Sequence, residues 1–324
     1  MTWLEQTANY HDEIAHRLAQ YYLNTSTPYK VISDIYIRLA KNGYPTAIDN
    51  LLSLVKKTSD KAVLREIAYF FEHYQQDLNT ATDIHIKISN NGKDTTSTDW
   101  LLQQAVSHPY ALQALDKLVN KAKLKTLYFD YAKVLLILED KQKALEFITK
   151  SAQMDDDKAI DWLFSHAPDE NQVYAILQKL IDDKGQADLY YRYALFLENQ
   201  QQKGEYIKYL LKAVELEKLQ AIGRIVDLSI QYDRIYAVFR NLTENSSSGI
   251  LYYHFALLEE SKQKSKETIY YLLKSFAFKN QSAEERLEHY AKRSHIVSYA
   301  FAESYEKNPH RPKKAVEYFI QSAQ

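Results

Sequence analysis

The chain has 324 residues, which would suffice for two ordinary domains or one elongated repeat array. Charged residues make up 26% of it and the net charge is −1, so we expect no strongly basic face and no nucleic-acid partner. The absence of cysteine excludes disulfides, thiolate catalysis and cysteine zinc sites, and no apolar run is long enough to predict a transmembrane segment.

Residues that form turns are scarce, with 6 glycines and 6 prolines, which favours helices joined by short connections. The hydrophobic fraction of 46% is enough for a substantial core. The 27 tyrosines suit helix–helix seams, where the ring is buried and the hydroxyl reaches a polar partner. They suit binding surfaces equally well, so their number does not decide between the two.

The first part of the chain, residues 1–90, is predicted to form degenerate helical repeats. Ala19 and Ala68 are 49 positions apart, as are Arg38 and Lys87, so these units are shorter than the later ones. The polar stretch 90–97 then predicts a break, with a main helical-repeat block over 98–324.

The main block carries an internal repeat of 62 residues. Ala132, Ala194 and Ala256 recur at this step, and each follows a leucine- and tyrosine-rich segment. We therefore predict double-hairpin modules over about 127–188, 189–250 and 251–295, close to tetratricopeptide spacing. In the second module, helices are expected at 188–199, 204–217, 219–231 and 233–243. The small alanines are predicted to let a neighbouring helix approach closely, and the 47-residue step from Lys274 to Gln321 indicates that one helix is dropped.

The joints between hairpins place a basic residue nine positions before an alanine, as in Arg38…Ala47, Lys150…Ala159, Lys212…Ala221 and Lys274…Ala283. This pattern resembles the Sel-one-like repeat family, relatives of the tetratricopeptide repeats, although only the first joint keeps a glycine, Gly43. The segment 39–44 also resembles scaffold lipoproteins of alginate-type exopolysaccharide export. The resemblance implies an all-α, right-handed α-solenoid of tetratricopeptide- or Sel-like hairpins that acts as a scaffold in bacterial assemblies, often in the envelope.

One helix position changes its charge between modules while its neighbours persist. Asp130, Arg192 and His254 occupy it, which indicates an exposed position, and the resemblance places it on the concave surface. It is either part of a binding surface or a solvent-facing position that is free to vary. Tyr191 and Tyr253 lie beside it and are either binding residues or core residues.

The sequence offers no constellation for catalysis or for a cofactor. The ten histidines show no metal-ligand spacing, and no glycine-rich phosphate loop is present. We therefore expect no enzyme activity, metal or cofactor, and the sequence does not favour a small-molecule ligand. The leading hypothesis is a protein–protein interaction scaffold or adaptor, and the alternative is an inhibitor or immunity-type protein that blocks an enzyme in the same groove. The compartment stays open: the periplasm or outer membrane, if a signal and lipid anchor were trimmed, or the cytoplasm.

Overall fold

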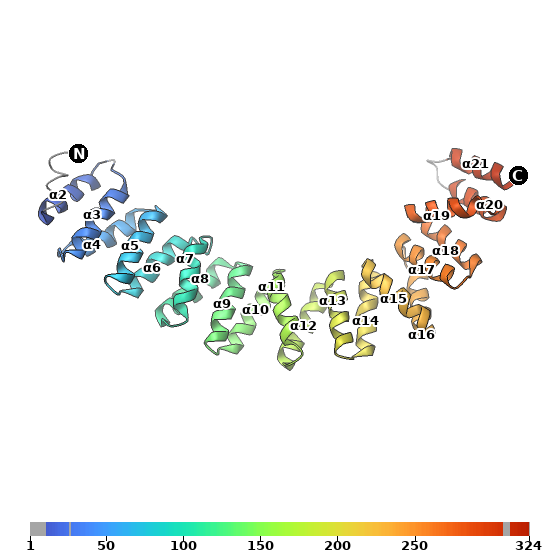
Figure 1. Cartoon of the computed structure of the whole chain (residues 1–324), viewed down its shortest axis with the longest axis horizontal. Helices are drawn as coiled ribbons and strands as arrows, with labels where there is room; N and C mark the ends of the chain where they lie inside the picture. The colour runs from blue at the N-terminus through green and yellow to red at the C-terminus, as the bar shows by residue number, and fades with distance from the viewer. Residues whose placement is uncertain (1–10, 26, 307–311, 324) are drawn as a thin grey trace. The chain divides into compact units, whose positions relative to one another are not determined.

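The computed structural model describes residues 11–25, 27–306 and 312–323. Within these ranges every regular element is an α-helix and no strand occurs (Figure 1). The prediction of an all-α solenoid of tetratricopeptide-like hairpins is confirmed. Contacts divide the chain into two compact units, 1–177 and 178–324, each built from helices that pack against their neighbours in sequence.

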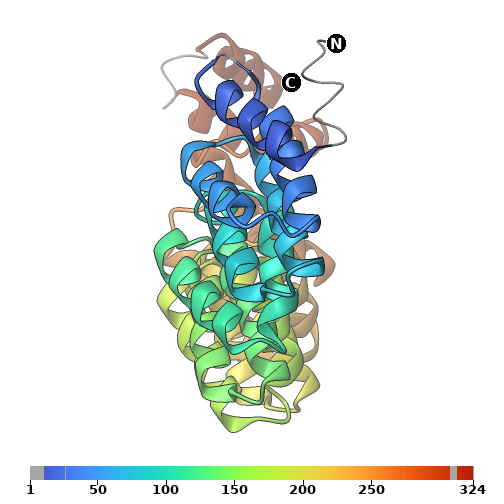
Figure 2. The same ribbon diagram turned by 90° about the vertical axis from the view of Figure 1, so that its left-hand side faces the viewer.

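The first unit contains helices from α2 onward, which Figure 2 shows in blue to green, stacked one behind another. Their bounds are α2 Asp12–Leu23, α3 Tyr29–Lys41, α4 Ala47–Lys57, α5 Lys61–His73, α6 Leu78–Ser89, α7 Thr95–Ala105, α8 Pro109–Ala122, α9 Lys125–Ile137, α10 Lys141–Gln153 and α11 Asp157–His166. The boundary between the units lies inside α12, Asn171–Lys184.

The second unit continues with the remaining helices. They are α13 Ala187–Asn199, α14 Lys203–Glu215, α15 Leu219–Gln231, α16 Asp233–Glu244, α17 Gly249–Ser261, α18 Ser265–Ala277, α19 Gln281–Ala291, α20 His295–Glu306 and α21 Pro312–Ala323. The hairpins α13–α14, α17–α18 and α20–α21 have closely packed helices.

The helix boundaries reproduce the 62-residue repeat. Helices α9, α13 and α17 begin at positions 125, 187 and 249, and the three helices that follow each of them keep the same step. The helices expected for the second module agree with the observed α13 to α16 within two residues at each end. Ala132, Ala194 and Ala256 are each 0% exposed, as expected of small residues at close helix contacts.

The predicted break at 90–97 is a tight turn inside the first unit. It joins α6 to α7, and these two helices pack against each other. Gly92 has φ of +79° there, and a Cβ at this position would lie 3.0 Å from Leu127 and 3.1 Å from Leu124. The contacts thus place the division between units at 177/178, whereas the polar composition indicated 90–98, because a turn can be polar while the helices on both sides share a core.

Glycine is replaced by other residues in the left-handed conformation at most of the repeated turns. The turns inside the hairpins have Glu139, Gln201 and Gln263 at φ of 58–62°, and those between hairpins have Asp155, Glu217 and Lys279 at 59–63°. This conformation costs a non-glycine residue about 1–2 kcal/mol. Few glycines are therefore needed, because the packed helices on both sides hold the turns in place.

Buried tyrosines connect adjacent helices through their hydroxyl groups. Tyr209 is 1% exposed and donates to Asp182 at 2.9 Å, and one module later Tyr271 is 2% exposed and donates to Glu244 at 2.7 Å. Burial, together with the hydrogen bond to Asp182, raises the pKa of Tyr209 to about 12. These residues fill the seams as predicted, and their hydroxyls are not left without partners.

Candidate functional site

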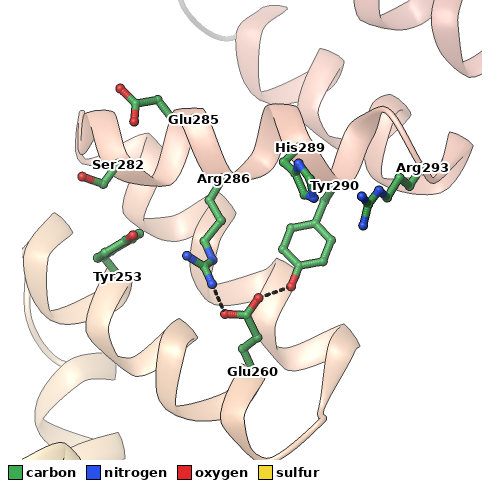
Figure 3. Close-up of a pocket in the computed structure, with 8 residues that line it drawn as sticks. All are labelled: Tyr253, Glu260, Ser282, Glu285, Arg286, His289, Tyr290 and Arg293. Carbon is green, nitrogen blue, oxygen red and sulfur yellow. Dashed lines mark hydrogen bonds and ion pairs between the residues drawn. The ribbon is translucent and has the colours of Figure 1, made fainter.

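A polar hollow of about 560 Å³ lies between α17 and α19 in the second unit (Figure 3). Helix α17 is the first helix of the hairpin α17–α18, and α19 follows that hairpin directly. Tyr253 and Glu260 line the hollow from α17. The residues that line it from α19 and the turn after it are Ser282, Glu285, Arg286, His289, Tyr290 and Arg293. We call this hollow the α17–α19 pocket.

The floor of the pocket is fixed by one carboxylate. Glu260 accepts hydrogen bonds from the Nη2 of Arg286 and from the hydroxyl of Tyr290, so both of its oxygens are engaged across the two helices (Figure 3). Burial and the hydrogen bond to Glu260 raise the pKa of Tyr290 to about 12, which keeps this hydroxyl a donor at neutral pH. Burial opposes the charge of Arg286, but the carboxylate outweighs it and raises the pKa of Arg286. The floor is therefore pre-organised and electrically balanced.

The rim of the pocket carries side chains that the floor does not use. Ser282, Glu285, His289 and Arg293 are all exposed. Glu285 lies in the first half of α19 and Arg293 in the turn after it, eight residues later, so the rim is acidic towards one end and basic towards the other. This arrangement can bind a ligand that offers hydrogen-bonding or charged groups in a fixed order.

The structure separates the predicted binding residues. Tyr253 is half-buried and lines the pocket, whereas Tyr191 occupies the equivalent half-buried position on α13. His254 is half-buried, its ring lies 5.7 Å from that of Tyr253, and burial lowers its pKa. Arg192 is also half-buried, and Asp130 is half-buried and forms an ion pair with Lys133 at 2.6 Å. The expectation that this position is exposed is therefore not met. Each of these helices contacts its neighbours over a wide part of its surface, so this position is partly covered.

The sequence contains a signal for the floor in the residues that recur at the repeat step. Glu198 and Arg224 precede Glu260 and Arg286 by 62 residues, and they form an equivalent ion pair between α13 and α15. The Nη2 of Arg224 donates to both oxygens of Glu198, whereas the Nη2 of Arg286 donates to one oxygen of Glu260. In the first module the same two positions hold Leu136 and Trp162. A carboxylate and an arginine that recur together at the repeat step therefore predict contact between the first helices of successive hairpins.

Two other hollows among the described residues contain none of the predicted binding residues. One, of about 750 Å³, lies beside the loop 245–248, and the other, of about 530 Å³, lies beside α6 and α8. The described ranges hold no group of three or more His, Asp or Glu side chains arranged to bind a metal ion. No helix in them has the length and apolar character that a membrane span requires.

Comparison with known proteins gives likeness only at the level of structure. No family model matches the chain, and no curated protein matches it, so membership of the Sel-one-like repeat family stays a prediction. Solved structures with a similar arrangement include a dimer of human IFIT1 with PPP-AAAA, at 12% identity and a TM-score of 0.34, covering 99% of this chain and 93% of the other. Monomeric IFIT1 variants with m7Gppp-AAAA and with Gppp-AAAA give the same identity and TM-score, covering 99% of this chain and 86% of theirs.

The expectation that nucleic acid is excluded as a partner is wrong. The finding against it is that the IFIT1 structures contain triphosphate or capped RNA. The physical reason lies in the argument from net charge. A total of −1 is a sum over the whole chain, whereas a ligand meets only the few charges around its own site. At this identity and TM-score the ligand of the present chain stays open.

Proposed function

We propose that the chain is a non-catalytic interaction scaffold, or adaptor, that binds a segment of a partner protein in the α17–α19 pocket. The observation that supports this most directly is that the floor residues bond to one another and leave the rim side chains available to a ligand. Glu260 accepts hydrogen bonds from Arg286 and Tyr290, which connects α17 to α19, while the rim groups stay exposed. A site that is already ordered loses less entropy on binding, which favours affinity for an extended segment.

The tyrosines support a polypeptide ligand. Tyr253 and Tyr290 are half-buried and line the same hollow, so each offers ring surface together with a polar edge. Tyrosine is enriched among the residues that dominate protein–protein binding energy, because it provides a large contact area with few rotatable bonds. A role in a bacterial assembly, including envelope exopolysaccharide export, is what the Sel-one-like resemblance implies, and the identity of the partner tests it.

Site-specific photo-crosslinking in cells that naturally produce the chain tests this proposal. A photoreactive amino acid replaces Ser282, which is exposed on the rim, and in a matched control it replaces Ser265, which is exposed at the start of α18 outside the pocket. We expect a discrete protein to be crosslinked through position 282 and not through position 265. Crosslinks to nucleic acid alone, or equal crosslinking from both positions, would reject the proposal.

Two further measurements locate the site and the role. The double variant Arg192→Glu with His254→Glu tests the helix position whose charge changes between the modules. If it remains folded by circular dichroism, loss of the crosslinked partner would extend the binding surface from the pocket to that position. If the recovered partner is an enzyme whose activity the chain blocks, the alternative of an inhibitor or immunity-type protein would replace the scaffold.

A further inference from the structure

We propose that the segment bound in the α17–α19 pocket is acidic, with a carboxylate that contacts the Arg293 guanidinium beside His289. This inference rests on the proposed function and adds the chemistry of the partner. It begins from an arginine at the pocket rim whose charge is not paired. Arg224, Arg240 and Arg286 each hold a carboxylate. Arg293 and Arg234 are exposed and form no ion pair with a side chain in the described part of the chain, and of these two only Arg293 lines the pocket.

His289 lies one helical turn before Arg293, and both side chains line the pocket (Figure 3). The imidazole offers a further nitrogen donor next to the guanidinium. An incoming carboxylate can therefore accept from Arg293 and from His289 together. Such charge-assisted hydrogen bonds are stronger than neutral ones.

The repeat shows that this basic pair is not needed to start the helix. The positions equivalent to Arg293 hold Asp169 and Gln231, and those equivalent to His289 hold Ser165 and Asp227. Helix α19 begins at the same step as its two counterparts, although it ends at Ala291, two positions earlier in the repeat than α15, which continues to Gln231. The basic end therefore belongs to this pocket alone among the three modules, which favours a role in ligand contact.

Glu285 gives the ligand a direction. It lies in α19, eight residues before Arg293 in the turn that follows, and a helix of that length would rise about 12 Å. An extended peptide covers that distance in about three to four residues. We infer that the acidic residue of the segment lies at the Arg293 end and that the residue three or four positions away is neutral or basic.

The same arrangement favours a peptide over a nucleic acid at this pocket. A nucleic-acid strand carries a phosphate at every nucleotide, so a strand lying along α19 would bring one against Glu285. A peptide can place its single carboxylate at Arg293 and another kind of side chain at Glu285. Single-stranded RNA is therefore the competing outcome in the experiment below.

Fluorescence anisotropy with the full chain tests the inference. The probes are fluorescein-labelled hexapeptides that begin with Lys-Gly-Tyr-Gly and end in two aspartates, two asparagines or two lysines, together with a labelled 5′-phosphorylated tetra-adenylate RNA. We expect the aspartate peptide to bind about tenfold more tightly than the asparagine peptide and the lysine peptide to bind least. Arg293→Gln should weaken the aspartate peptide about five- to tenfold and leave the asparagine peptide unchanged. Arg234→Gln removes another exposed arginine of the same unit outside the pocket, and it should leave the affinities of the aspartate and asparagine peptides unchanged.

Three results would overturn the inference. The first is that the aspartate and asparagine peptides bind equally or not at all, and the second is that Arg293→Gln binds the aspartate peptide as tightly as the unmodified chain does. The third is that the RNA binds more tightly than the aspartate peptide and that Arg293→Gln abolishes this RNA binding. The crosslinking experiment separates this failure from that of the proposed function. A protein crosslinked through position 282 with no preference for acidic peptides rejects only the acidic segment. Absence of any protein crosslink at that position rejects the scaffold itself.

Discussion

A fully buried carboxylate in α17 offers the sharpest test of how this repeat core is built. Glu259 is 0% exposed and occupies the position that Leu135 and Leu197 fill in the preceding modules, at 2% and 0% exposed. Neither of its oxygens accepts a hydrogen bond of ordinary geometry from a described residue, and its ion-pair partner, the Nζ of Lys264, is 3.4 Å from Oε2. The carboxylate has therefore lost water without gaining a full set of partners.

Replacing Glu259 with leucine should stabilise the fold. Burying a leucine side chain contributes about 1.5–3 kcal/mol, and exchanging a buried ion pair for apolar residues is often neutral or stabilising by about 1–4 kcal/mol. The Lys264 side chain is 44% exposed, so its ammonium can regain water once the carboxylate is gone. We expect Glu259→Leu to raise the free energy of unfolding by about 1–2 kcal/mol.

Urea unfolding followed by far-ultraviolet circular dichroism measures this change. Lys264→Ala is the companion variant, and because it leaves the carboxylate buried and unpaired, it should lower the free energy of unfolding by about 2–3 kcal/mol. In the Glu259→Leu background the same substitution should have little effect, which a double-mutant cycle detects. A loss of more than about 1 kcal/mol in Glu259→Leu would refute the reasoning, since the carboxylate would then make a contact that the fold requires.

Three further predictions use the same unfolding assay. Ala194→Phe should lower the free energy of unfolding by about 1–3 kcal/mol, because the alanine is fully buried at a close helix contact; an unchanged midpoint would contradict that packing. Gln201→Gly should raise the free energy of unfolding by about 0.5–1 kcal/mol, because glycine adopts the left-handed conformation at φ of 59° without strain. A decrease would show that contacts of the glutamine side chain outweigh this strain. His85 is 7% exposed and stacks on Trp100 at 4.1 Å, and burial, with a smaller effect of Arg65, lowers its pKa to about 4. Between pH 6.5 and 4 the unfolded chain therefore binds a proton that the folded chain does not, so stability should be full above pH 6.5 and fall by about 2–3 kcal/mol towards pH 4. His85→Phe should lose this part of the pH dependence, and an equal slope in both proteins would refute it.

The candidate site was predictable only in part. Tyr253 was predicted from its place beside the helix position whose charge changes between modules. It lines the α17–α19 pocket, and its role in binding stays a prediction. The floor was missed, although Glu198 with Arg224 and Glu260 with Arg286 repeat at the same step as the alanines. The two members of each pair are 26 residues apart and lie on different helices. Their contact therefore depends on how the first helices of successive hairpins pack, which the spacing of residues along one helix does not reveal. Arg293 carries no sequence signal beyond its difference from Asp169 and Gln231.

The sequence by itself determined the fold class, the repeat step and most helix boundaries of the modules. Those features follow from local backbone preferences and from apolar spacing along single helices, which the order of residues states directly. Only the tertiary structure placed the division between the units inside α12, made Glu259 a buried carboxylate and joined Glu260 to Arg286 and Tyr290. Each of these features depends on which faces of different helices pack together. That choice is made by close packing between helices and not by the local preferences that define each helix.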